Sequence, residues 1–274
     1  MSITPIVAGN WKMNKTPSKG VTFVEECMNM LLDIEKVHVI FCPPFTGLFD
    51  IDAASPFSIG AQHCHWKDQG AFTGEISVGM LKDCGVDYVI VGHSERRHVF
   101  GETDSWINRK IKAIINADLT PIFCIGETLK QRESGHTNRI LKRQLRDGFK
   151  KVDFVEKLVI AYEPVWAIGS GVTAAVEQVA DAHLQVKNIL SMHCSCNVDE
   201  SGENSALFFG LDKKKAIQEV KIAMELYPRT KDAFDSDRYE MYLAQIYAVT
   251  GKHTKALDII ERHLEGPSNT NWWD

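Results

Sequence analysis

The 274-residue sequence contains no apolar run approaching 18 residues, the length that a membrane-spanning helix needs. It also lacks an excess of positive charge, since 31 lysine and arginine residues against 36 aspartate and glutamate residues give a formal net charge of -5. Lysine and arginine are scattered, so nucleic acid is not an expected partner. The first 14 residues lack the order of a signal peptide. We therefore expect a cytoplasmic protein with neither a membrane nor a nucleic-acid partner.

Cysteine is scarce as well, with seven residues spread from Cys27 to Cys196. An odd number in a chain of this size fits reduced thiols better than a disulfide framework. Cys194 and Cys196 stand beside His193, a spacing that can contribute to a metal site. A single Cys-x-Cys without a second ligand pair is a weak signal, so we predict no metal.

Two alternating patterns fill the first 190 residues. Short β-branched apolar runs predict strands, and the stretches between them carry apolar residues three and four apart, which predicts amphipathic helices. Six strands are predicted, at Ile6–Gly9, Val37–Phe41, Phe57–Ala61, Tyr88–Gly92, Pro121–Ile125 and Leu158–Tyr162. The clearest helices are predicted at Gly20–Leu32, Thr103–Ala117, Asn138–Phe149 and Ala174–Leu190. This alternation indicates a parallel α/β sheet covered by helices, either open and doubly wound or closed as a barrel.

The pattern changes after a polar, turn-forming stretch at residues 197–204. We therefore predict a βα portion at residues 1–196 and a helical segment at residues 205–266. The predicted helices of that segment are Lys213–Leu226, Asp237–Val249 and His253–Leu264.

The helical segment resembles tetratricopeptide-type repeats, because leucine, alanine and tyrosine on Tyr242–Tyr247 precede a turn at Gly251 and then Ala256. A competing interpretation makes Leu207–Leu211 a seventh strand and Met241–Val249 an eighth. The helical composition of residues 240–249 favours the repeat.

Three unusual segments follow predicted strands: Gly9–Asn14, Val91–Arg97 and Ala161–Gly171. Parallel α/β folds place their sites at the carboxyl ends of strands. A lysine, a histidine and a glutamate at three such ends can therefore converge on one small substrate.

These segments resemble the triosephosphate isomerase family over about residues 3–190. Further motifs appear in the family's order: Phe41–Phe45, Gly60–Gln62, Gly70–Ser77 and Cys124–Thr128. The resemblance implies a βα barrel that interconverts dihydroxyacetone phosphate and glyceraldehyde 3-phosphate without a cofactor, in glycolysis and gluconeogenesis. It also implies a homodimer or larger homo-oligomer.

The resemblance also implies roles for individual residues. Glu163 would be the catalytic base and His93 the neutral electrophile, a feature taken over from the family. Lys12 would be a third catalytic residue, whose positive charge complements the oxyanion, and would also bind the substrate together with Asn10. Gly169, in a closing loop at Pro164–Thr173, would offer a backbone N–H to the phosphate. Glu95 would anchor Lys12, and Thr73 would lie in the loop that the family inserts into its partner subunit.

The sequence departs from the family after residue 190. The family's Tyr-Gly-Gly-Ser and Gly-Gly motifs, whose backbone amides hold the phosphate, are missing, and the nearest string is Leu207–Leu211. At the hinge of the closing loop the family's Lys-Thr-Ala is replaced by Val172, Thr173 and Ala174. We therefore expect an incomplete barrel of six or seven strands. Its first and sixth strands would be open edges, covered by the tail helices or by a second subunit.

Two functions remain open at this point. The leading one is an isomerase, intact or weakened at its phosphate site. The alternative is an impaired, isomerase-derived scaffold whose helical tail recruits a partner, and a fusion without a selected function is a third interpretation.

Overall fold

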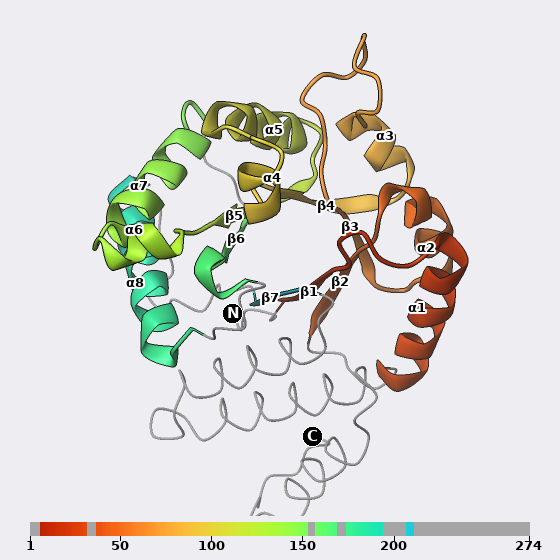
Figure 1. Cartoon of the computed structure of the whole chain (residues 1–274). Coiled ribbons are helices and arrows are strands. Elements are labelled where there is room, and N and C mark those ends of the chain that lie inside the picture. The colour runs from red at the N-terminus through yellow and green to blue at the C-terminus, as the bar shows by residue number, and fades with distance from the viewer. Residues whose placement is uncertain (1–5, 32–36, 153–156, 169–173, 194–206, 211–274) are drawn as a thin grey trace, which may run out of the picture.

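A computed structural model describes residues 6–31, 37–152, 157–168, 174–193 and 207–210 of the chain. Strands and helices alternate through it (Figure 1). The strands are β1 (Ile6–Asn10), β2 (His38–Cys42), β3 (Ser58–Ala61), β4 (Val86–Val91), β5 (Thr120–Ile125), β6 (Val159–Tyr162) and β7 (Leu207–Gly210). The α-helices are α1 (Pro17–Leu31), α2 (Leu48–Ala54), α3 (Val78–Asp83), α4 (Ser94–His98), α5 (Asp104–Asn116), α6 (Leu129–Glu133), α7 (Thr137–Gly148) and α8 (Val176–His193). Two short 3₁₀ helices are η1 (Phe45–Gly47) and η2 (Val165–Ala167).

The described strands form one parallel sheet in the order β6-β5-β4-β3-β2-β1-β7. The sheet curls, and the edge strands β6 and β7 approach each other to Cα separations of 8 Å or less. The described helices lie around the outside of the strands (Figure 1). The fold is therefore an incomplete βα barrel of the triosephosphate isomerase type, as predicted, with all six predicted strands confirmed to within two residues at their ends.

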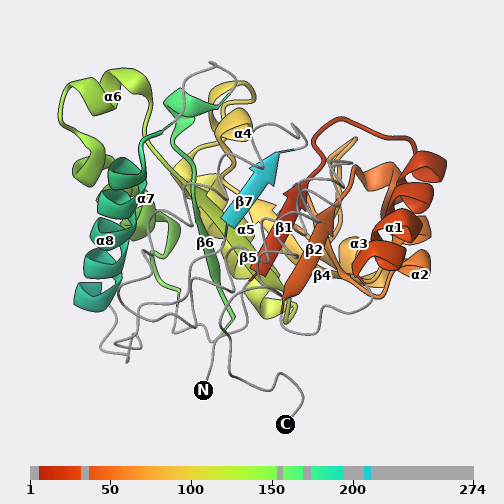
Figure 2. The same ribbon diagram turned by 90° about the horizontal axis from the view of Figure 1, so that it is seen from below.

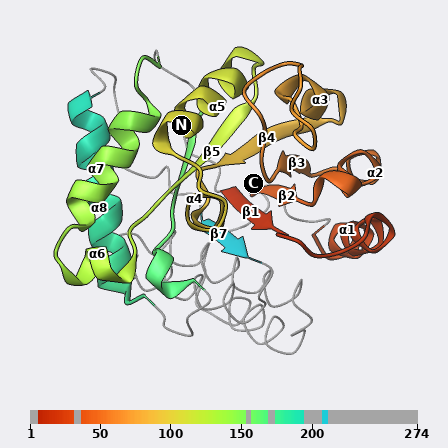
Figure 3. The same cartoon turned by 45° about the horizontal axis from the view of Figure 1, so that its top comes forward.

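The seventh strand corrects two expectations. β7 pairs with β1 from Val7 opposite Leu207 to Asn10 opposite Gly210, so the first strand is not an open edge (Figures 2 and 3). The expectation of helices alone after Ala206 is also wrong at Leu207–Gly210, where the competing interpretation placed a strand. A four-residue apolar run is too short for periodicity to distinguish strand from helix, and the backbone groups of β1 need a partner. The predicted boundary, the tetratricopeptide-like helices and the proposed eighth strand lie outside the described residues.

Both faces of the sheet are buried. One core consists only of strand residues, including Ala8, Ile40, Ile90, Ile122 and Ala161. Ala8 lies opposite Ile40, and Ile90 lies opposite Ile122, on neighbouring strands. A second core lies between the sheet and the helices. Helices enter it through apolar residues at helical spacing, such as Ile107, Ile111 and Ile114 of α5. Burial on both faces explains why the strands are nearly continuous apolar runs.

Candidate active site

Three strand ends carry the predicted catalytic residues to the same edge of the sheet. Asn10 ends β1, His93 follows β4 after Gly92, and Glu163 follows β6 directly. Two glycines make this approach possible. Gly92 has a φ of +73°, a left-handed conformation that favours glycine. A Cβ on Gly126 would lie 1.7 Å from the Glu163 carbonyl oxygen, so only glycine lets the ends of β5 and β6 pack this closely.

His93 and Glu163 form a buried pair. Glu163 Oε1 lies 3.0 Å from His93 Nε2, and the side chains are 7% and 6% exposed. The backbone N–H of Ser94, the first residue of α4, donates to Glu163 Oε2 at 3.1 Å. Both oxygens of the carboxylate therefore have partners.

The partner of the second ring nitrogen fixes the protonation of His93. The backbone N–H of Glu95 donates to His93 Nδ1 at 3.2 Å, so Nδ1 carries a lone pair. We infer a neutral ring whose proton lies on Nε2 and is donated to Glu163.

The charges of the pair are coupled. Burial lowers the pKa of His93, but the facing Glu163 carboxylate outweighs it and the net direction is upward. Burial raises the pKa of Glu163, but His93, the Ser94 N–H and Lys12 together lower it. Glu163 is thus ionised near neutral pH, the state from which a general base begins.

Lys12 is held in an unusual backbone conformation. Its φ is +51°, which is uncommon outside glycine, and such strain often marks functional positions. Its N–H donates to Asn10 Oδ1 at 3.0 Å, and Gln62 Nε2 donates to its carbonyl oxygen at 2.9 Å. Its ammonium lies 2.7 Å from Glu95 Oε1. The predicted Lys12–Glu95 contact is therefore present. The sequence indicates Gln62 only as part of the Gly60–Gln62 motif.

The segment after β6, where the closing loop is predicted, begins beside a buried carboxylate that sequence reasoning missed. Glu127 is fully buried, and both its oxygens lie 3.0 Å from the Tyr162 hydroxyl. Trp166 Nε1 and Arg132 Nη1 donate to Glu127 Oε1 at 3.1 and 2.9 Å. In the sequence, the feature that could have indicated Glu127 is a single acidic residue between the buried strand β5 and the capped helix α6. The structure describes the predicted loop only as far as Ile168, so Gly169, Val172 and Thr173 lie outside the described residues.

Comparisons with known proteins agree with this geometry. A family model described as Triosephosphate isomerase matches residues 5–203. The chain is 44% identical over 211 residues to "Triosephosphate isomerase" of Endomicrobium trichonymphae, covering 75% of this chain and 83% of that protein. It is 48% identical over 191 residues to the protein of the same name from Carboxydothermus hydrogenoformans, covering 68% and 76%.

The chain belongs to the triosephosphate isomerase family. The family supports an isomerase.

The loop that carries Thr73 connects β3 to α3 and protrudes from the barrel (Figure 1). Thr73 is exposed, and Phe72 beside it is 42% exposed.

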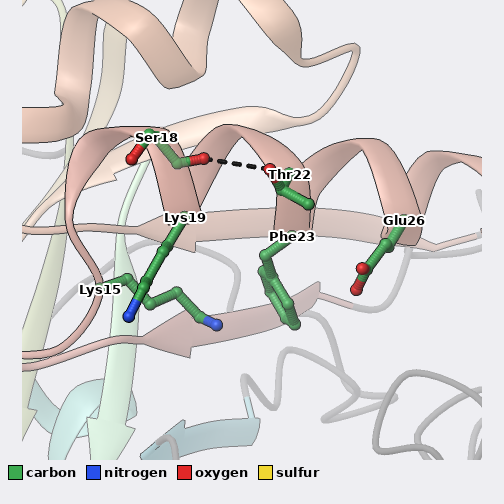
Figure 4. Close-up of a pocket in the computed structure, with 6 residues that line it drawn as sticks. All are labelled: Lys15, Ser18, Lys19, Thr22, Phe23 and Glu26. Carbon is green, nitrogen blue, oxygen red and sulfur yellow. Dashed lines mark hydrogen bonds between the residues drawn. The ribbon is translucent and has the colours of Figure 1, made fainter.

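A surface pocket of about 350 Å³ lies along α1 (Figure 4). It is lined by Lys15, Ser18, Lys19, Thr22, Phe23 and Glu26. None of the predicted catalytic residues lines it, so the pocket does not coincide with the candidate active site.

Within the described part of the chain, no three metal-ligating side chains gather into a metal site, and no helix is long and apolar enough to span a membrane. Cys194 and Cys196 lie outside that part.

Proposed function

We propose that this chain interconverts dihydroxyacetone phosphate and glyceraldehyde 3-phosphate by proton transfer through an enediolate. The observation that carries the proposal is the buried pair of Glu163 and His93, 3.0 Å apart, at the same sheet edge as Lys12. Glu163, as the base, takes a proton from the carbon beside the substrate carbonyl. The electron pair of that C–H bond forms a carbon–carbon double bond while the carbonyl π pair moves onto the oxygen, which gives the enediolate. The hydroxyl proton then moves from the oxygen of the deprotonated carbon to the former carbonyl oxygen, and Glu163 returns its proton to the former carbonyl carbon.

His93 and Lys12 stabilise the charge that develops on the substrate oxygen. The inferred Nε2–H of His93 faces Glu163 at rest and donates to the oxyanion once substrate lies between them. The Lys12 ammonium supplies the compensating positive charge, and Asn10 holds the Lys12 backbone. No step requires a cofactor. The contact of the Gly169 N–H with the phosphate stays a prediction from the family.

We also propose that binding of the phosphate is weakened. The sequence lacks the two glycine motifs by which the family holds the phosphate. Each lost hydrogen bond to a charged group costs roughly 1.5–3 kcal/mol, so we expect a Michaelis constant at least tenfold above that of a relative with both motifs. Part of the binding energy also drives catalysis, so turnover should fall as well.

A scaffold role, the alternative, gives no reason for this arrangement. A protein that only recruits a partner through residues 205–266 does not need a buried imidazole–carboxylate pair beside a strained lysine. The cytoplasmic location and the recruiting tail stay predictions.

A coupled assay on glyceraldehyde 3-phosphate, and in the reverse direction on dihydroxyacetone phosphate, tests the proposed reaction. We expect conversion well above the buffer rate. We also expect a non-reactive phosphate analogue to inhibit the reaction, with a dissociation constant at least tenfold above that of a relative with both glycine motifs. Conversion at the buffer rate by a protein with a folded circular dichroism spectrum would favour the scaffold instead. An affinity for the analogue equal to that of an intact relative would contradict the weakened phosphate site.

We further propose that the chain forms a homodimer or larger homo-oligomer through the protruding loop. The exposed Phe72 beside Thr73 supports this proposal. Light scattering at micromolar concentration should show at least twice the 30.8 kDa mass of the chain. A monomer at that concentration would contradict the proposal.

A further inference from the structure

A second cluster of buried ionisable side chains lies between the protruding loop and helices α4 and α5, and the proposed reaction does not use it. Its members are His63, Glu75, Arg96, Glu102 and Lys110, and we call it the loop cluster. Lys110, Glu102 and His63 are only 1%, 5% and 8% exposed. Burying charged groups is costly unless each one is paired, so each of these side chains is expected to contact a partner within the cluster.

Glu102 is the centre of the loop cluster. Its Oε1 atom accepts hydrogen bonds from Lys110 Nζ at 2.5 Å and from Arg96 Nε at 2.8 Å. Burial by itself would raise the pKa of Glu102, but His63, Lys110 and Arg96 together hold it well below its ordinary value. The Glu102 N–H also donates to the Arg96 carbonyl oxygen at 3.0 Å. Glu102 therefore fixes Arg96, and with it helix α4, to helix α5.

His63 connects this pair to the protruding loop. His63 Nδ1 lies 3.0 Å from Lys110 Nζ and 3.2 Å from Glu102 Oε1. On the other side of the ring, Nε2 lies 2.8 Å from Glu75 Oε2 and 3.4 Å from Arg96 Nη2. Glu75 belongs to the loop itself, and its side chain is 35% exposed. One imidazole thus spans from the exposed loop to the buried Lys110–Glu102 pair.

Helix α4 is also where the candidate active site is held. Its first residue, Ser94, donates its N–H to Glu163, and the next, Glu95, pairs with Lys12. Arg96, the third residue of the same short helix, belongs to the loop cluster. A shift of α4 by a fraction of an ångström changes both contacts of the site, and misplacement of this size is costly in catalysis.

We propose that His63 is a positioning residue that links the protruding loop to helix α4, so that the loop conformation sets the position of Ser94 and Glu95 in the active site. The link runs from Glu75 through the His63 ring to Lys110 and Glu102, and from there to Arg96. The consequence for activity rests on the proposed isomerase function. The mechanical link between loop and helix does not.

Two substitutions at position 63 separate the two hydrogen bonds of the ring. His63→Asn keeps an acceptor near the position of Nδ1 for Lys110 but cannot reach Glu75. His63→Gln keeps a donor near the position of Nε2 for Glu75. Glu75→Ala removes the loop end of the link without touching the buried pair, and Asp68→Ala, an exposed carboxylate in the same loop, is the matched control.

Hydrogen–deuterium exchange measured by mass spectrometry tests the mechanical link without any assay of activity. We expect His63→Asn and Glu75→Ala to speed exchange about tenfold in both the 66–76 peptide and the α4 peptide, because each variant loses one charge-assisted hydrogen bond. His63→Gln and Asp68→Ala should remain within about twofold of the parent. Faster exchange in the loop with no change in α4 would overturn the proposal, as would equal exchange in the Asn and Gln variants.

The kinetic measurement then tests the positioning role. We expect His63→Asn and Glu75→Ala to lower kcat about 5- to 10-fold with little change in KM, and His63→Gln to restore kcat to within about twofold. If the exchange result holds while kcat is unchanged, positioning by His63 is refuted and the link is only structural. If the parent itself lacks activity, the proposed function fails while the exchange result still decides the link.

Discussion

The described part of the chain contains two buried pairings of histidine with glutamate, and they are built differently. In the loop cluster, the Glu102 carboxylate accepts hydrogen bonds from a lysine and an arginine, and two cations balance two carboxylates around His63. In the active site, Glu163 is held by one imidazole and one backbone N–H, while the Lys12 ammonium pairs with Glu95 instead.

The difference separates a structural pairing from a reactive one. A carboxylate fixed by two cations is expensive to move and remains ionised, which suits a residue that joins helices. A carboxylate held by an imidazole and an amide can exchange these partners for a substrate and then take up a proton. Neutralising Glu163 is therefore expected to reduce catalysis, whereas neutralising Glu102 is expected to reduce stability.

The largest expected effect is on catalysis at Glu163. Glu163→Gln retains the shape of the side chain but cannot accept the substrate proton, so kcat in the coupled assay should fall by at least 10²- to 10⁴-fold. The free energy of unfolding should change by less than about 1 kcal/mol, as expected for loss of an exchangeable partner. Activity within about threefold of the parent would remove Glu163 from the role of base.

The reverse result is expected at Glu102. Glu102→Gln leaves Lys110 and Arg96 facing a neutral amide, and breaking a buried ion pair typically costs about 3–5 kcal/mol of stability. Urea unfolding should show this loss as a lower midpoint with an unchanged slope. The comparison between the two carboxylates fails if Glu102→Gln is no less stable than Glu163→Gln.

His183 of α8 sharpens the comparison, because it packs on Tyr162 rather than joining either pairing; their ring centroids are 6.0 Å apart. Burial, with Lys187 nearby, lowers its pKa from 6.5 to about 4. Below pH 6.5 His183 binds a proton in the unfolded chain, whereas in the folded chain it stays neutral down to about pH 4. The free energy of unfolding therefore falls as the pH decreases from 6.5 toward 4.

His183→Phe should therefore lose less stability than the parent on acidification. Between pH 7 and pH 5 the difference in unfolding free energy between variant and parent should shift by about 2 kcal/mol in favour of the variant. Urea unfolding at several pH values measures it. A constant difference would show that His183 protonates equally in both states.

The smallest expected effect concerns the buried carboxylate of Glu127. Tyr162→Phe removes the hydroxyl beside Glu127 but leaves the hydrogen bonds from Trp166 and Arg132, so the unfolding free energy should fall by only about 1–2 kcal/mol. A loss of unfolding free energy as large as that of Glu102→Gln would mean that Glu127, like Glu102, has a structural role.

The alternation of apolar runs with helical periods predicted a parallel α/β sheet and its first six strands, because these runs are buried on both faces. The choice of a barrel over an open sheet came from the resemblance to the family. It predicted the site residues through motifs at strand ends, and the structure brings Asn10, Lys12, Glu95, His93 and Glu163 together. These roles, like those of Gly169 and Thr73, stay predictions.

What the sequence could not predict depends on contacts distant along the chain. The pairing of β7 with β1 joins residues 200 positions apart, and four apolar residues carry too little pattern to indicate it. The loop cluster joins His63 to Lys110 and Glu102, whose charges look like ordinary surface residues in the sequence. Glu127 was visible as part of a motif, but only the structure shows that Tyr162, Trp166 and Arg132 donate hydrogen bonds to it.

Isomerisation in D₂O tests the central claim most directly. A base that removes the proton beside the carbonyl can exchange it with solvent before returning it to the neighbouring carbon. The parent should therefore convert dihydroxyacetone phosphate to product carrying deuterium at the former carbonyl carbon, detected by proton NMR. Glu163→Gln should give neither product nor deuterium exchange above the buffer control. Conversion without deuterium in the product, or undiminished exchange by Glu163→Gln, would contradict proton transfer through Glu163.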